Sequence, residues 1–212
     1  MPTTTVSKQT LRRYSDAVTR LATQPKGNLL IALQSLEWQD VTADANRAVA
    51  IMQAASGSGS NLAAVASAEF YKSLRHAAIG GKYPAIAVSG WVPEATEGAV
   101  RSFVWDVIDG NRDVFESKCL DRYEYDVRNS AKRCIGYNAQ RDPARVRYAV
   151  VPSGECCDFC AMLASRGFVY HDADSCEDIH PHCTCSAVPD FAEVKGYDPE
   201  SYYERYLEGP FA

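Results

Sequence analysis

Cysteine and histidine residues gather in one short segment of the chain. Cys157 and Cys160 form a C-x-x-C pair, and farther along the chain comes the pattern His180-x-x-Cys183-x-Cys185. Two residues between two thiolates let one tight turn present both sulfurs to a single metal ion at ~2.3 Å. A second Cys/His pair at such an interval is typical of zinc sites. The segment therefore predicts one zinc ion, Zn2+, bound by protein side chains.

The segment offers more candidate ligands than the four that a zinc ion needs. We predict the set Cys157, Cys160, His180 and Cys185. Cys183 is the rival for the fourth place, since residues 183 and 185 point to the same side of a strand. The weaker candidates nearby are Cys156, His171, Cys176 and His182. We interpret His182 as an exposed or supporting residue outside the ligand set.

The available thiols indicate a structural zinc site. A catalytic zinc keeps one position open for water and usually has a general base beside it. The sequence has no H-E-x-x-H helix, and it lacks the H-x-E that precedes P-C-x-x-C in zinc deaminases. We therefore expect no enzymatic activity, and a metal that replaces part of a small hydrophobic core. The alternative is a zinc-dependent, DNA-acting accessory enzyme of nuclease-like type, or a toxin module.

The distribution of cysteines also indicates where the chain folds. Six of the eight lie between Cys156 and Cys185, whereas a disulfide framework would spread them. No stretch approaches the ~20 apolar residues that cross a bilayer. Residues 1–8 lack the apolar region of a secretory signal. We expect folding in a reducing cytoplasm and no membrane partner.

Long amphipathic helices are expected before the cysteine cluster. Apolar residues recur every three or four positions in five stretches within residues 1–140. The second is expected to be one helix from near Asn28 through Met52, and the fifth, from Phe115 to Cys134, is the clearest. Pro93 suits the first turn of the fourth stretch. The run Gly57-Ser58-Gly59-Ser60 is expected to break the helical pattern as a flexible turn. These features predict an α-helical domain over residues 1–140.

The character of the sequence changes after Asp142-Pro143. Val146, Tyr148 and Val150 alternate with other residues, which predicts a strand with one apolar face. A short helix over residues 158–166 and a last helix over residues 198–207 are expected to follow. The predicted fold class is α+β: a mainly α-helical N-terminal domain, then a small zinc-stapled α+β domain over residues 141–212.

Charge is distributed unevenly along the chain, whose net charge is −5. Residues 1–27 carry five basic and one acidic side chain, whereas residues 148–212 carry three basic and twelve acidic ones. The last quarter should therefore repel phosphate backbones. We expect any contact with DNA to come from the basic N-terminal arm, which contains Lys8, Arg12, Arg13 and Arg20, or from residues 112–147, which carry nine basic and six acidic side chains.

Residues 144–191 resemble the Mu F-like minor head proteins of phages, in the variety carried by phages of actinobacteria. The resemblance rests on Val151-Pro152-Ser153-Gly154, on residues 157–167 (CDFCAMLASRG), on residues 180–185 (HPHCTC) and on Val188-Pro189. It implies a low-copy minor capsid protein of the virion, near the portal or in the capsid interior, that is made in the host bacterial cytoplasm. The implied role is head morphogenesis or DNA delivery, with the portal or other head proteins as partners and packaged DNA as a further one.

Overall fold

Helices account for most of the structure, and a few short strands pair segments that are far apart in the sequence. The computed structural model describes residues 5–154, 156–175, 182–191 and 193–208. In chain order the elements are β1 (Thr5–Val6), α1 (Lys8–Thr23), α2 (Lys26–Gln34), α3 (Val41–Ile79), α4 (Pro93–Ile108), α5 (Arg112–Arg141), β2 (Tyr148–Val151), α6 (Asp158–Ser165), β3 (Ser186–Pro189), β4 (Glu193–Val194) and α7 (Pro199–Glu208). This mainly helical chain with a small α+β part confirms the predicted fold class. Among the described residues, no helix is both long and apolar enough to cross a membrane.

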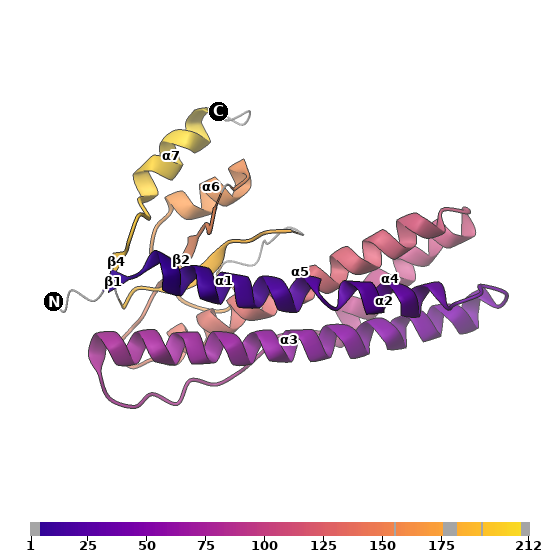
Figure 1. Cartoon of the computed structure of the whole chain (residues 1–212), viewed down its shortest axis with the longest axis horizontal. Helices are drawn as coiled ribbons and strands as arrows, with labels where there is room; N and C mark the ends of the chain where they lie inside the picture. Colours follow the sequence, from indigo (N-terminus) through magenta and orange to yellow (C-terminus); the bar gives the residue numbers. More distant parts are fainter. Residues whose placement is uncertain (1–4, 155, 176–181, 192, 209–212) are drawn as a thin grey trace.

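The long helices pack around α5. Helices α1 and α2 follow one another along α3, and α5 contacts all three of them as well as α4 (Figure 1). The apolar stripe predicted for this helix is confirmed, because its members Phe115, Cys119, Tyr123, Val127, Ala131 and Cys134 are all buried. Pro93 stands in the first turn of α4, as expected. The two upstream cysteines thus serve as small apolar core residues.

The predicted turn at residues 57–60 is wrong, since α3 continues through it for 39 residues in all. Glycine suits positions 57 and 59 because side chains from other parts of the chain pack directly against α3 at these two positions. A Cβ atom on Gly59 would lie 2.7 Å from Val127 Cγ2 and 2.8 Å from Tyr123 Oη, and one on Gly57 would lie 2.9 Å from the Trp91 ring. Close packing against α5 and Trp91 therefore outweighs the weak helix propensity of glycine.

A second helix boundary also differs from expectation. The stretch from Asn28 to Met52 is not one helix, because α2 ends at Gln34 and α3 begins at Val41. Asp40 marks the new start, where its side chain accepts a hydrogen bond from the backbone N–H of Ala43. An aspartate at this position satisfies a donor that the first turn leaves unpaired. This cap explains why α3 starts at Val41.

The strands form two small pairs. Strand β2 pairs antiparallel with β3, with Tyr148 opposite Pro189, and β1 pairs parallel with β4, with Thr5 opposite Glu193. The prediction of one apolar face for β2 is wrong, because all four of its residues are buried. Helices α5 and α6 both pack against this strand, so neither face meets solvent. The apolar core continues from the helices into β2, β3 and Leu163 of α6. The division into domains at residues 140 and 141 stays a prediction.

Candidate metal centre

The first half of the cysteine cluster lies at the start of α6. Cys157 is the N-cap residue of this helix, and its Sγ accepts a hydrogen bond from the backbone N–H of Cys160 at 3.5 Å. The C-x-x-C spacing thus places one thiol at the N-cap of α6 and the other in its first turn. Backbone N–H groups at a helix N-terminus stabilise negative charge nearby, which suits sulfur in the thiolate form that binds metals.

The second half of the cluster approaches Cys160 from the segment before β3. Cys183 Sγ lies 3.4 Å from Cys160 Sγ. The sulfurs of Cys160, Cys183 and Cys185 all lie within 4.8 Å of one another. A tetrahedral zinc ion with Zn–S bonds of ~2.3 Å holds its sulfurs ~3.8 Å apart. The three thiols therefore cluster at a spacing that fits a metal ion.

Crowding makes these thiols hard to ionise without a cation. Hydrogen bonding with Cys183 and burial raise the pKa of Cys160, and contacts with Cys160 and Cys183 raise the pKa of Cys185. Each thiolate would oppose the loss of the next proton, because like charges at this distance repel. A divalent cation among the sulfurs reverses this effect, since metal ligands are deprotonated.

The structure unites part of the predicted ligand set. Cys160 and Cys185 lie together, and the rival Cys183 joins them instead of replacing Cys185. The thiols of Cys183 and Cys185 both lie near Cys160. Strand β3 begins only at Ser186, so the alternation of side chains along a strand does not explain this arrangement. Cys157 is exposed beside Cys160, and His180 lies outside the described residues.

The weaker candidates occupy other places. Cys156 is half-buried, and its carbonyl accepts a hydrogen bond from Arg205 of α7. His171 is exposed beside Asp172. Cys176 lies outside the described residues.

His182 faces α5 and not the thiols. Its Nδ1 lies 3.2 Å from Glu124 Oε2 and its Nε2 lies 3.3 Å from Asp121 Oδ1. Glu124 is nearly buried and also accepts hydrogen bonds from Lys26 at 2.8 Å and Arg128 at 2.9 Å. His182 therefore ties the loop that carries Cys183 to a charged network on the helices.

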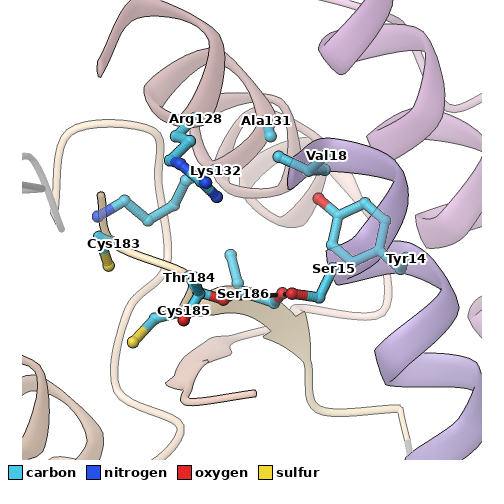
Figure 2. Close-up of a pocket in the computed structure, with 11 residues that line it drawn as sticks. Tyr14, Ser15, Val18, Arg128, Ala131, Lys132, Cys183, Thr184, Cys185 and Ser186 are labelled. Atoms are coloured by element: carbon cyan, nitrogen blue, oxygen red, sulfur yellow. Dashed lines mark hydrogen bonds between the residues drawn. The ribbon is translucent and has the colours of Figure 1, made fainter. Parts of the chain in front are cut away.

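Two buried cations of α5 lie beside the cysteine segment. Arg128 and Lys132 of α5 are 7% and 6% exposed, and they line a cavity of about 20 Å³ together with Cys183 and Cys185 (Figure 2). A zinc ion bound by three or four thiolates carries net negative charge, which nearby cations offset. The sequence pattern did not indicate either residue, because a charged side chain on an amphipathic helix is ordinarily exposed.

Helix α1 also holds the cysteine segment in place. Ser15 Oγ donates a hydrogen bond to the carbonyl of Thr184 at 3.3 Å, across the cavity that Figure 2 shows. Ser153 Oγ, from the loop after β2, donates to the same carbonyl at 3.0 Å. Thr184 lies between the two clustered cysteines, so these bonds position both of their backbones.

Comparison with known proteins gives a family for the chain. Neither the curated proteins nor the solved structures include a match. The VG15 protein family matches residues 5–209, a span that contains the helices and the thiol cluster alike. The chain, with its cysteine cluster seated on long helices, therefore belongs to the VG15 family, whose members are viral proteins of the gene-15 type.

Proposed function

We propose that this chain is a structural protein of a phage head, a minor capsid protein of the Mu F-like type that assists head assembly or DNA delivery. The observation that carries the proposal is the family match over residues 5–209, because it assigns the whole described architecture to viral proteins. The Mu F-like motif in residues 144–191 supports the finer assignment. We place the protein in the virion, in the capsid interior near the portal.

In this proposal a structural zinc ion holds the C-terminal part in shape. Cys160, Cys183 and Cys185 supply three ligands, and the fourth comes from Cys157, with His180 as the alternative. The spacing of the three clustered sulfurs and the two cations beside them support this choice. When bound, the metal stabilises the fold, because zinc that binds only the folded state contributes its binding energy to folding.

The protein would act through its surfaces and not as an enzyme. Four protein ligands close the coordination shell and leave no position for an activated water. The cluster found among the described residues consists of thiols alone. The partners we propose are the portal or other head proteins, and packaged DNA through Lys8, Arg12, Arg13 and Arg20. All four of these basic residues are exposed on α1.

Localisation in purified virions tests this function. Mass spectrometry of purified particles should detect the chain at low copy, and cross-linking should join it to the portal or to another head protein. Absence of the chain from particles would overturn the proposal. So would a metal-dependent nuclease or hydrolase activity of the purified protein, if one polar substitution abolished it while fold and zinc content were retained.

A further inference from the structure

A strand near the start of the chain and a strand before the last helix pair beside a basic pocket. Pairing of β1 with β4 brings the start of α1 to the turn that follows β4, where the backbone N–H of Lys195 donates to the carbonyl of Val6 at 3.3 Å. A Cβ atom on Gly196 would lie 2.6 Å from Lys8 Cε and 2.8 Å from Lys8 Nζ. The side chain of Lys8 therefore crosses directly over Gly196, next to Lys195.

Three cations converge on one cavity of about 170 Å³ at this junction. Lys8 and Arg12 are four residues apart, so they share a face of α1, and Lys195 approaches from the turn after β4. None of the described residues that line the cavity is an aspartate or glutamate. Across the part of the chain that the structure describes, none of the three forms an ion pair with a carboxylate. The cavity thus has a concentrated positive charge that no carboxylate of the described residues neutralises.

The walls of this cavity are apolar and aromatic. Leu11, Val151 and Val194 are buried beneath it, and the half-buried rings of Tyr197 and Tyr202 form one side. The two rings pack with their centroids 5.9 Å apart. Tyr197 is also anchored, because its hydroxyl donates to the carbonyl of Ala164 at 2.6 Å. The wall is therefore held in position before any ligand arrives.

We propose that this pocket binds a backbone phosphate of DNA, an inference that rests on the proposed contact between the protein and packaged DNA. Cations without a protein partner favour a phosphate, and aromatic rings beside them favour a nucleic acid over an acidic peptide, since bases and sugars pack on such rings. Only Lys8 and Arg12 of the basic arm line the pocket, whereas Arg13 and Arg20 do not. The acidic last quarter of the chain contributes the third cation, Lys195.

Binding of the full zinc-loaded chain to a fluorescent DNA oligonucleotide tests the pocket. Dissociation constants measured by anisotropy over a range of salt concentrations are compared among Lys8→Gln, Lys195→Gln, Arg20→Gln in the basic arm outside the pocket, and the control Lys82→Gln far along the chain. Each variant removes one positive charge, so all four have the same net charge. Circular dichroism and zinc content show whether each variant keeps its fold.

Removal of one phosphate contact should weaken binding about eightfold at 0.1 M salt and lower the salt slope by about one. We expect this for Lys8→Gln and Lys195→Gln, a smaller effect for Arg20→Gln, which lies in the basic arm but outside the pocket, and the smallest for the control Lys82→Gln. An equal effect of Arg20→Gln would overturn the pocket while leaving DNA contact by the whole arm intact. Failure to bind DNA, or tighter binding of an acidic peptide that depends on Lys195, would overturn a DNA site here. Neither result would contradict a place for the protein in the phage head.

Discussion

The sulfur atoms of Cys160 and Cys183 lie 3.4 Å apart, although 23 residues separate the two cysteines along the chain. Cys160 belongs to the first turn of α6, and Cys183 belongs to the segment that enters β3. Both sulfurs are nearly inaccessible, because the residues are 2% and 5% exposed. A metal ion at this point would join the two halves of the C-terminal part.

Protein purified without added metal should contain one zinc ion per chain by elemental analysis. Cys160→Ser and Cys183→Ser should each lose the zinc and unfold the segment around α6 and β3, since each removes a proposed ligand. Cys119→Ala, a substitution of a buried cysteine in the core of α5 outside the thiol cluster, should keep it. A metal-free, fully folded protein with Cys157 in a disulfide would contradict a zinc site.

Substitution of His182 should have a mild effect. The His182 side chain is 62% exposed, and its partner Glu124 keeps its bonds to Lys26 and Arg128 without it. We expect His182→Ala to retain zinc and to lower the free energy of unfolding by less than about 1 kcal/mol, as for exposed ion pairs. Urea denaturation with parallel zinc analysis measures both. Loss of zinc in this variant would place His182 among the ligands.

Removal of zinc should leave most of the helical signal. The long helices lie upstream of the cluster, and their core residues, among them Phe115, Tyr123 and Val127, are buried in an apolar core that the helices largely build. We expect a strong chelator to reduce the far-UV circular dichroism signal only modestly, through α6 and the segments near it. If nearly all helix disappeared on chelation, residues 1–140 would not be a separately stable domain.

A methyl group at Gly59 should destabilise the protein. The added Cβ would meet Val127 Cγ2 at 2.7 Å and Tyr123 Oη at 2.8 Å, so α3 and α5 would have to separate. We expect Gly59→Ala to cost about 1–3 kcal/mol, as overpacking of a core does. Gly98→Ala is the matched control in exposed α4, where nothing lies within 4 Å. It should instead stabilise the protein by about 0.5–1 kcal/mol. Thermal unfolding measures the stability of both variants, and a Gly59→Ala protein as stable as the parent would contradict the close approach of α3 and α5.

The Cys119 thiol should resist alkylation in the folded protein. Burial raises the pKa of Cys119 to about 12, so very little thiolate forms at pH 8, and the side chain is fully covered. Iodoacetamide at pH 8 should leave Cys119 unmodified both before and after chelation, whereas chelation should make the cluster cysteines reactive. Peptide mapping by mass spectrometry identifies the modified residues. Rapid labelling of Cys119 in native protein would mean that the core around α5 opens readily.

Local patterns predicted much of this architecture. The apolar spacing of α5, the proline at the start of α4 and the short helix after Cys157 each depend on neighbours within a few residues, so sequence alone indicates them. The prediction of a turn at Gly57 and Gly59 is wrong, because the contacts that decide the structure there involve residues distant in sequence. Glycine by itself disfavours a helix. Here, however, the side chains of Val127 and Trp91 pack so closely against α3 that a Cβ atom would clash with them, and both residues are distant in sequence.

The sequence by itself determined the residue types of the site: a C-x-x-C pair, a second group of thiols and a basic first helix. Only the tertiary structure decided which of them meet. It placed Cys183 together with Cys185, turned His182 toward Glu124, buried Lys132 beside the thiols and brought Lys195 to Lys8. These contacts join segments far apart in the chain, and packing of whole helices and strands fixes them. No local spacing encodes such a distance, because it depends on how the remaining elements fill the core.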